Sequence, residues 1–358
     1  MFNGARILVA PLDWGLGHST RDIPIIRRLL ELDARPVIGA DESPLALLRG
    51  EFPDLPWARI AGPLVRYAAS GSQGKVLADQ FPTMLRWVWT EHDITKRIMR
   101  EQKLDAIISD QRFGVRHRSL PSVLVTHQVF PHIPFAQSLL RRLNRWQVQR
   151  FDRCWIMDEE QAPGLAGELS HGDRSPRNAR YIGPQSRLTK GTVVSVKHHR
   201  IIAVISGPEP QRTMLEAKLT EQLRVVEGDH LLVCGTPKTP SDTTSGNIRK
   251  VSHLGAEELN AALHGAEFII SRTGYTSLMD FAALGRTALV IPTPGQPEQE
   301  YLGELHQRSG RFIVQAQETL DVRKGIADLA GRVPIAPANS GHALDEALRE
   351  LSTLITPR

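Results

Sequence analysis

Residues 265–302 read GAEFIISRTGYTSLMDFAALGRTALVIPTPGQPEQEYL, and this stretch decides the fold. Two short apolar runs, Phe268–Ile270 and Ala288–Ile291, lie on either side of a helical pattern at Ser277–Leu284. A strand, a helix and a second strand in close succession form a βαβ unit, whose two strands are parallel in one sheet. We therefore expect this part of the chain to lie in an α/β domain with a parallel sheet.

The same alternation of strands and helices continues outward from this stretch in both directions. In the C-terminal half we expect further strands at Ile201–Ile205, His230–Val233 and Arg311–Val314, and helices at Thr213–Leu223, Glu257–Leu263 and Glu298–Arg308. In the N-terminal half we expect strands at Arg6–Ala10, Pro36–Ile38, Ala106–Ser109, Ser122–Val125 and Cys154–Met157, and helices at Asp22–Leu32 and Met84–Gln102. This pattern predicts two Rossmann-like, doubly wound parallel-sheet domains that face a cleft.

A length of 358 residues agrees with two domains. Pro176–Gly191 is rich in Pro, Gly, Ser and Arg, so we place a linker at residues 182–192. The N-terminal domain is then residues 1–181 and the C-terminal domain residues 193–340. Residues 341–358 hold a last helix, at Ala343–Leu354, which we consider able to pack back on the N-terminal domain. Thr236–Gly246 is expected to be a polar loop.

Composition limits the class of protein. No apolar stretch approaches the roughly 18 residues that span a bilayer, and the run Ile7–Leu12 is too short for a signal peptide. Two cysteines, Cys154 and Cys234, exclude a disulfide framework and a cysteine-rich zinc site. We therefore expect a cytoplasmic protein, with a peripheral position on the inner face of the membrane as a further option.

Positive charge is concentrated between Gln111 and Phe151, where there is no acidic residue. Seven arginines lie in this stretch, at positions 112, 116, 118, 141, 142, 145 and 150. Within it, residues 135–151 resemble a basic amphipathic helix with Leu139, Leu143 and Trp146 on one stripe. Such a helix can lie on an anionic membrane, but we expect this stripe to pack on the sheet. Nucleic-acid binding is not expected, because no known module is present.

Polar residues follow three predicted strands of the N-terminal half. The first strand ends in PLDWGLGHST, residues 11–20, where Gly15 and Gly17 permit a tight turn before His18 at a helix N-terminus. Asp110 ends another strand, and His127-Gln128 ends the next. Each residue alone is often structural. Because ligands of parallel sheets bind beyond the carboxyl ends of the strands, we group them in one site.

Three strand-end loops of the C-terminal half carry groups that suit a sugar nucleotide. Residues 206–213 (SGPEPQRT) and 271–277 (SRTGYTS) combine glycine, hydroxyls and arginine ahead of a helix, which favours a diphosphate. Residues 292–301 (PTPGQPEQEY) offer carboxylate and amide groups that suit sugar hydroxyls. Neither a Walker A loop nor a dinucleotide fingerprint is present.

Residues 265–302 resemble the donor-binding motif of glycosyltransferase family 28, which has the GT-B fold and includes the peptidoglycan N-acetylglucosaminyltransferase. The resemblance covers about 120 residues of the C-terminal half and is sparse in the N-terminal half. It implies that Asp280 binds the donor ribose, that Gln299 and Glu300 contact the sugar, and that uracil lies near Gly255 and Ala256. Asp280 replaces the family's usual glutamate and Glu300 a glutamine, which leaves the sugar open.

The resemblance extends to two further segments. Gly183–Arg187 is similar to the family's interdomain stretch, which implies a donor contact by Arg187. Gly15-Leu16-Gly17-His18 is similar to the family's N-terminal glycine-rich loop, whose histidine lies near the reaction centre. In these enzymes the N-terminal half recognises the acceptor.

We therefore expect an inverting glycosyltransferase that moves a sugar, such as N-acetylglucosamine or another hexose, from a UDP-sugar to a hydroxyl acceptor. A lipid-linked or cell-envelope glycan is one option for this acceptor. His18 is the expected base, with Asp13 as its orienter or its replacement. The remaining donor-binding candidates are Ser206, Gly207, Arg212, Arg272, Thr273, Gly274 and Tyr275, and the acceptor-binding candidates are Gly15, Gly17, Asp110, His127 and Gln128.

No cofactor or obligatory metal is expected beside the UDP-sugar, because helix N-termini and arginines can neutralise the diphosphate. Two alternatives stay open. The first is a sugar-nucleotide hydrolase or epimerase on the same fold, and the second is a non-catalytic sugar-nucleotide-binding subunit.

Overall fold

A computed structural model describes residues 1–62, 73–132, 137–190, 198–236, 239–332 and 341–355. These residues divide into two compact units. Unit 1 takes residues 1–62, 74–187 and 341–355, and unit 2 takes nearly all the rest from residue 188 to 332. The last part of the chain therefore returns to the unit in which the chain began.

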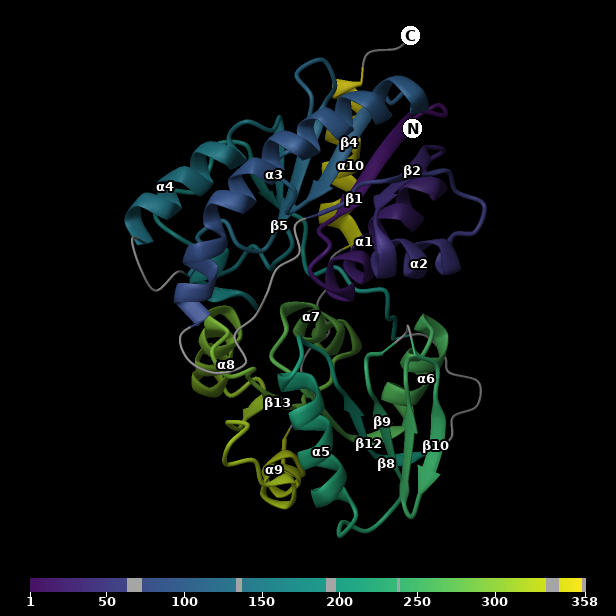
Figure 1. Cartoon of the computed structure of the whole chain (residues 1–358), viewed down its shortest axis with the longest axis vertical. Helices are drawn as coiled ribbons and strands as arrows, with labels where there is room; N and C mark the ends of the chain where they lie inside the picture. The colour runs from purple at the N-terminus through teal and green to yellow at the C-terminus, as the bar shows by residue number, and fades with distance from the viewer. Residues whose placement is uncertain (63–72, 133–136, 191–197, 237–238, 333–340, 356–358) are drawn as a thin grey trace. The chain divides into compact units, whose positions relative to one another are not determined.

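Unit 1 is built on a seven-stranded, fully parallel sheet with the order β3-β2-β1-β4-β5-β6-β7. Figure 1 labels its strands β1, β2, β4 and β5. Its strands are β1 (Arg6–Pro11), β2 (Arg35–Ala40), β3 (Trp57–Arg59), β4 (Ala106–Asp110), β5 (Ser122–Thr126), β6 (Arg153–Ile156) and β7 (Ala179–Tyr181). Every residue of β4 and β5 is buried. A parallel strand covered on both faces needs such a continuous apolar run, which explains why these strands are readable in the sequence.

The helices of unit 1 are α1 (Leu16–Glu31), α2 (Glu42–Glu51), α3 (Gln73–Gln102), α4 (Gln137–Val148) and α10 (Gly341–Leu354), with a 3-10 turn at Gly167–Leu169. Ion pairs hold α10 to this unit: Arg28–Asp345, Arg153–Glu350 and Arg180–Glu346. The partners come from α1, β6 and β7, so α10 bridges both halves of the sheet.

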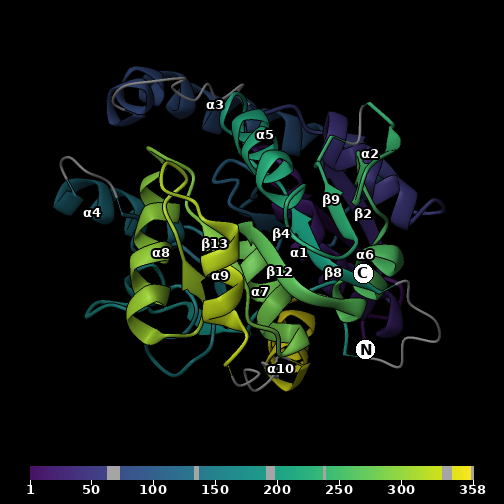
Figure 2. The ribbon, with the colours of Figure 1, turned by 90° about the horizontal axis from the view of Figure 1, so that it is seen from below.

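Unit 2 contains a second seven-stranded sheet with the order β10-β11-β9-β8-β12-β13-β14, and Figure 2 shows β8, β12 and β13 side by side. Its strands are β8 (His199–Val204), β9 (His230–Val233), β10 (Asp242–Ser245), β11 (Ile248–Val251), β12 (Ala266–Arg272), β13 (Leu289–Ile291) and β14 (Ile313–Val314). Its helices are α5 (Gln211–Leu223), α6 (Ala256–Gly265), α7 (Tyr275–Leu284), α8 (Pro297–Ser309) and α9 (Val322–Leu329). Leucines of α5 and apolar residues of α9 join one buried core with the strands. The predicted fold class, two doubly wound α/β sheets, is confirmed.

One local prediction in unit 2 is wrong. Within the expected polar loop Thr236–Gly246, residues Asp242–Ser245 form β10, which pairs antiparallel with β11. Positions 237–238 lie outside the described residues. All four residues of β10 are exposed polar side chains at the sheet edge, so no alternation of apolar and polar residues marks the strand.

The basic amphipathic helix is also placed differently from its prediction. The structure has α4 at Gln137–Val148, and residues 135–136 lie outside the described part of the chain. Leu139, Leu143 and Trp146 are 59%, 42% and 54% exposed, so the expectation that this stripe packs on the sheet is wrong. The opposite face holds α4 in place, because Val148 is buried there.

The predicted linker at 182–192 stays a prediction. Ile182 to Gln185 are buried with unit 1, and residues 191–192 lie outside the described residues. None of the described helices is long and apolar enough to cross a membrane.

Candidate functional site

Three neighbouring strands of unit 1 bring polar side chains to one edge of the sheet. The glycine loop that holds His18 follows β1, Asp110 is the last residue of β4, and His127 follows β5 directly. The strands are adjacent and parallel in the order β1-β4-β5, so their carboxyl ends share one edge. The grouping predicted from the sequence is therefore present in the fold.

Asp110 and His18 form the central pair of this edge. His18 Nδ1 lies 2.9 Å from Asp110 Oδ2. The pair requires the loop after β1 to turn back sharply over the sheet. Gly15 allows this turn with φ of 119°, a backbone conformation that residues with a Cβ rarely adopt. The Thr20 hydroxyl donates to the Gly17 carbonyl at 2.9 Å and holds the first turn of α1.

Arg21 completes the group, and we name the four residues His18, Arg21, Asp110 and His127 the His18 cluster. Arg21 Nε donates to Asp110 Oδ2 at 2.7 Å, and Nη2 donates to Asp110 Oδ1. Nη2 is also 2.8 Å from His18 Nδ1, and Nη1 is 3.1 Å from His127 Nδ1. The sequence interpretation missed Arg21. Its signal was the spacing of three residues from His18, which puts both side chains on one face of the helix.

Burial controls the protonation of this cluster. Arg21 and Asp110 are fully buried, whereas the side chain of His18 keeps 17% of its surface exposed. Burial opposes ionisation of Asp110, but Arg21 and then His18 outweigh it and hold the pKa of Asp110 well below its usual range. Burial, followed by the Arg21 charge, lowers the pKa of His18, although Asp110 opposes that shift. His18 is thus a neutral imidazole at neutral pH with an outlet to solvent.

Asp22, beside Arg21 in α1, is a second buried acid. Neither of its carboxyl oxygens has a hydrogen-bond partner within the described residues. Burial and the Asp110 charge raise its pKa well above the usual value, and Arg21 only partly opposes them. Burial therefore favours the protonated form of Asp22, whereas Asp110 is the carboxylate that Arg21 holds ionised.

Asp110, which the sequence assigned to the acceptor, is a carboxylate that accepts a hydrogen bond from His18 although it is 92 positions away in the chain. Asp13, the expected orienter of His18 or its replacement as base, stays a prediction. Gln128, the remaining predicted residue of this edge, lies with its Nε2 3.2 Å from His127 Nε2.

In unit 2, Arg272 occupies the corresponding edge at the end of β12. It is fully buried and donates from Nη2 to the Gln211 carbonyl at 2.7 Å and from Nη1 to the Pro292 carbonyl at 3.3 Å. Its Nε has no hydrogen-bond partner among the described residues. Burial lowers the pKa of Arg272 to about 10, so it remains a cation at neutral pH. It ties together the loops after β8, β12 and β13.

Hydrogen bonds also join the loops after β12 and β13. The Thr273 hydroxyl donates to the Gln299 carbonyl at 2.9 Å, and the Gln299 side-chain oxygen accepts from the Thr293 amide at 3.0 Å. The Glu300 carboxylate accepts from the Gly295 amide at 2.8 Å. The side chains of Gln299 and Glu300 therefore accept hydrogen bonds from backbone amides of the loop that precedes α8. These bonds fix the positions of both side chains at the start of the helix.

Helices α6, α7 and α8 begin at this edge of unit 2 without a side-chain cap from the residue before them, which is Gly255, Gly274 and Gln296 in turn. At α5 the Glu209 carboxylate accepts from the Thr213 amide at 3.2 Å. By contrast, Asp321 accepts from the Lys324 amide and caps α9. Ser206 is exposed, and Gly207 has φ of 114° in the loop before α5. Such termini favour negatively charged ligands.

The other predicted donor residues differ in their surroundings. Tyr275 and Ala256 are buried in the first turns of α7 and α6, and Asp280 is partly buried on α7. Arg187 is buried at the end of unit 1. Arg212 is engaged elsewhere, because Nε donates to Glu209 at 2.6 Å and Nη1 donates to Glu216 at 3.0 Å. We therefore no longer assign Arg212 to the diphosphate, since two carboxylates already neutralise it.

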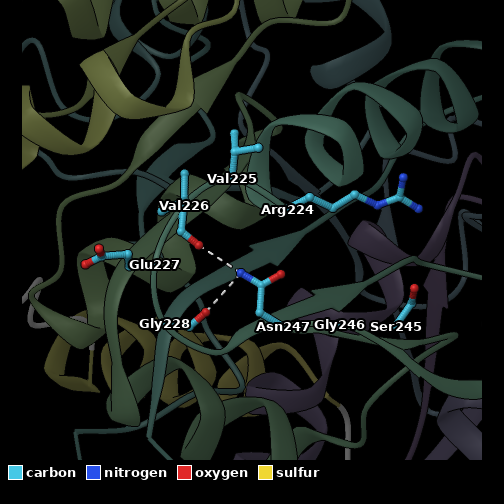
Figure 3. Close-up of a pocket in the computed structure, with 8 residues that line it drawn as sticks. All are labelled: Arg224, Val225, Val226, Glu227, Gly228, Ser245, Gly246 and Asn247. Atoms are coloured by element: carbon cyan, nitrogen blue, oxygen red, sulfur yellow. Dashed lines mark hydrogen bonds between the residues drawn. The ribbon is translucent and has the colours of Figure 1, made fainter.

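A hollow in unit 2 lies away from these loops. It is lined by residues of the segments 224–228 and 245–247, which precede β9 and β11 (Figure 3). The Asn247 side chain donates to the carbonyls of Val226 and Gly228 at 2.8 and 3.2 Å there. Because it sits at the amino ends of the strands, where parallel sheets do not bind ligands, we regard it as a structural corner.

Residues 237–330, in unit 2, match the glycosyltransferase family 28 C-terminal domain. The C-terminal unit therefore contains a domain of the glycosyltransferase family 28 type. The match covers the loops after β12 and β13, and it confirms the resemblance inferred from residues 265–302. No curated protein matches the sequence.

Solved glycosyltransferase structures confirm that the chain has the GT-B fold. The glycosyltransferase SnogD from Streptomyces nogalater is 18% identical, with 99% of this chain and 96% of that chain covered and a TM-score of 0.62. MurG of Acinetobacter baumannii is 12% identical, with 98% and 99% covered and a TM-score of 0.55. The spinosyn rhamnosyltransferase SpnG, solved with thymidine diphosphate, is 15% identical, with 98% and 96% covered and a TM-score of 0.61.

Proposed function

We propose that the chain transfers a sugar from a UDP-sugar to a hydroxyl acceptor with inversion at the anomeric carbon. The observation that carries the proposal is the pair formed by His18 and Asp110. When Nδ1–H of His18 donates to Asp110, the lone pair of the imidazole lies on Nε2. That nitrogen is a base for the acceptor hydroxyl.

The reaction then follows in one displacement. His18 Nε2 takes the acceptor proton while the acceptor oxygen forms a bond to the anomeric carbon. The bond between that carbon and the diphosphate oxygen breaks, and UDP leaves with the bonding electrons. Asp110 stabilises the imidazolium that results, because its carboxylate is ionised and bonded to the ring. We therefore give the role of orienter to Asp110 instead of Asp13.

Unit 2 supplies the donor site in this proposal. Its family 28 domain and the diphosphate bound to the structural relative SpnG support a nucleoside diphosphate donor. The loops at Ser206–Gly207 and Arg272–Tyr275 would hold the diphosphate. Buried Arg272 and the uncapped start of α7 supply positive potential for the leaving group, so we propose that no metal is needed.

The remaining donor contacts follow the family resemblance. Asp280 would bind the ribose, Gln299 and Glu300 the sugar, and the start of α6 at Gly255–Ala256 the uracil. Arg187 stays a candidate contact from unit 1. The carboxylate of Glu300 accepts hydrogen bonds only, so it favours a donor sugar with a hydroxyl at the matching position.

We propose a lipid-linked acceptor on an anionic membrane. The α4 stripe of Leu139, Leu143 and Trp146 is exposed, and on α3 Leu85 and Trp89 are exposed as well. No acidic residue occurs from 111 to 151. Exposed apolar side chains next to arginines are the combination with which an amphipathic helix binds anionic lipid.

Product analysis tests the catalytic proposal. The full chain is incubated with a panel of UDP-sugars, with and without hydroxyl acceptors. Sugar transfer to an acceptor is expected, and rapid hydrolysis or isomerisation without acceptor would favour the alternative enzymes on the same fold. Donor binding without turnover in any mixture would favour a binding subunit. Hydrogen exchange of the full chain with UDP locates the donor, because protection is expected at 206–207 and 272–280.

Vesicle sedimentation tests the membrane proposal. The chain should bind vesicles that contain anionic phosphatidylglycerol and not vesicles of neutral phosphatidylcholine. Leu143→Glu should reduce this binding at least severalfold. The matched control is Val225→Glu, which places the same charge on an exposed apolar residue of unit 2. Equal binding by both variants would contradict a role for α4.

A further inference from the structure

Arg21 is the member of the His18 cluster for which base catalysis alone gives no reason. A histidine base needs one carboxylate to orient it, and Asp110 does this. Arg21 is nevertheless buried and contacts all three other members of the cluster. Burying a guanidinium is costly unless its hydrogen bonds are well satisfied, so this placement calls for a functional reason.

The contact to His127 determines where that ring carries its proton. Arginine donates hydrogen bonds and cannot accept them. With Arg21 Nη1 at 3.1 Å, Nδ1 of His127 must carry the lone pair, and the proton of the neutral ring lies on Nε2. Gln128 Nε2 lies 3.2 Å from that nitrogen, and two N–H groups cannot bond to each other. In this tautomer of His127 the Gln128 amide is therefore turned so that its oxygen accepts from Nε2–H. His127 Nε2 is therefore a hydrogen-bond donor.

In His18 the proton of the ring lies on the other nitrogen, Nδ1. His18 Nδ1 is 2.9 Å from Asp110 Oδ2 and 2.8 Å from Arg21 Nη2, so carboxylate and guanidinium compete for the same nitrogen. Nη2 carries two hydrogens and donates one of them to Asp110 Oδ1. The ionised Oδ2 of Asp110 can only accept, so a lone pair on His18 Nδ1 would face that negative oxygen at 2.9 Å. We therefore assign the hydrogen of His18 to Nδ1, where it donates to Oδ2, and the lone pair to Nε2.

We propose that Arg21 is a positioning residue that gives the two histidines different roles: His18 Nε2 accepts a proton, and His127 Nε2 donates a hydrogen bond. This inference rests on the proposed transfer reaction. Through Asp110, the guanidinium fixes the tautomer of the base, and through Nη1 it fixes that of the second ring. One acceptor hydroxyl can then lose its proton to His18 while His127 donates to a neighbouring acceptor oxygen.

Nuclear magnetic resonance of the full chain with ¹⁵N-labelled histidine tests the tautomers without any substrate. At pH 8 we expect the Nδ1–H form for His18 and the Nε2–H form for His127, with the signals assigned through His18→Gln and His127→Gln. In Arg21→Lys, one ammonium cannot hold Asp110 and both rings, so the His127 signal should become a mixture of tautomers. A His127 ring with its proton on Nδ1, or unchanged tautomers in Arg21→Lys, would overturn the proposal.

Steady-state kinetics of two variants then separates the effect of the positive charge of Arg21 on kcat from the effect of its bidentate geometry. The charged or titratable groups that act on His18 are Arg21 of α1, Asp110 of β4 and His127 after β5. Arg21→Gln removes the charge that opposes protonation of His18, so the acid limb of the kcat profile should move to higher pH. Arg21→Lys keeps the charge, so its limb should stay while kcat falls roughly tenfold or more at every pH. Donor KM should change little in either variant.

Arg27→Gln is the matched control, because Arg27 lies on the same helix in a surface ion pair with Glu51. It should leave both the limb and kcat unchanged. An acid limb that stays in place in Arg21→Gln would overturn the proposal, and if that variant does not fold, the Arg21→Lys spectra still decide. If the chain transfers no sugar to any acceptor, the proposed function fails, whereas the histidine spectra still judge Arg21.

Discussion

The carboxyl edges of the two sheets use the same topology for different chemistry. The edge of unit 1 holds the His18 cluster, in which buried charged side chains contact one another directly. The edge of unit 2 holds loops whose helices start without side-chain caps, around the single buried cation Arg272. A proton acceptor must have a fixed tautomer and a tuned pKa, which only packed side chains provide. A diphosphate needs several weak positive groups, which backbone amides provide.

The effect of a substitution on stability is also expected to differ between the two edges. In unit 1, the negative charge on Asp110 is balanced by Arg21 in full burial, and burial raises the pKa of the second acid, Asp22, well above its usual value. Loss of either partner leaves an uncompensated buried charge. In unit 2, the donor loops rest on hydrogen bonds between backbone and side chains, such as that from Thr273 to Gln299. Substitutions should therefore affect rate and stability in unit 1, and mainly donor affinity in unit 2.

His18→Ala should have the largest effect. Removal of a general base costs about 10²–10⁴-fold in rate, so kcat should fall by that factor. UDP affinity should change little, because the donor groups lie in unit 2. Steady-state kinetics and calorimetric titration with UDP measure the two quantities. If kcat survives and donor affinity falls, His18 is a binding residue, and Asp13 becomes the candidate base.

Asp110→Asn should lower kcat by about 10²-fold, since the amide no longer stabilises the imidazolium. It should also reduce the free energy of unfolding by about 3–5 kcal/mol, because Arg21 stays buried without its counter-charge. Thermal unfolding and kinetics on the folded fraction test both effects. Asp41→Asn, in the partly exposed pair with Arg59, is the control and should lose much less stability. Equal losses would contradict the comparison.

Asp280→Ala should weaken UDP binding by about 10- to 150-fold, which corresponds to the roughly 1.5–3 kcal/mol of a charge-assisted hydrogen bond. The melting temperature should stay close to that of the wild type, because Asp280 is only partly buried. Asp328→Ala on the exposed face of α9 is the control. Unchanged UDP affinity would remove the ribose role, and a collapse of the melting temperature would show that Asp280 is structural.

The pH dependence of kcat/KM should reflect the lowered pKa of His18. The base acts when it is unprotonated, so kcat/KM should stay level from pH 8 down to the ordinary histidine pKa of about 6.5. It should fall about tenfold per pH unit only at lower pH. In that range His18 binds more protons in the unfolded chain than in the folded one, so the contribution of His18 to stability should also fall as the pH drops below about 6.5. If kcat/KM already falls above pH 7, the proposal that the base is a buried histidine whose pKa is lowered next to Arg21 is contradicted.

Arg212→Met should have the smallest effect, a change in UDP affinity below about threefold, or less than about 1 kcal/mol, because its side chain is only 12% exposed and is held by ion pairs within unit 2. Its guanidinium is already engaged with Glu209 and Glu216. The same calorimetric titration measures it. A tenfold loss of affinity would return Arg212 to the donor site and show that its ion pairs exchange on binding.

Local patterns in the sequence determined the architecture and the donor loops. Buried parallel strands such as β4 and β5 are continuous apolar runs, so they can be read without knowledge of their neighbours. The motif around Arg272 and Asp280 lies within one βαβ segment, and its spacing survives in the sequence. Short or exposed strands escaped prediction: β3 and β7 have three residues each, and β10 has no apolar face.

Only the tertiary structure decided which side chains meet. His18 and Asp110 are 92 residues apart and touch because β1 and β4 are neighbours in the sheet, an order that no local pattern encodes. Arg21 gained its role from the same order, since Asp110 and His127 reach it from two different strands. The exposure of the α4 stripe likewise depends on which face of the helix meets the sheet. Strand composition is a local property of the chain, whereas contacts across a sheet depend on strand order, which forms only when the whole domain folds.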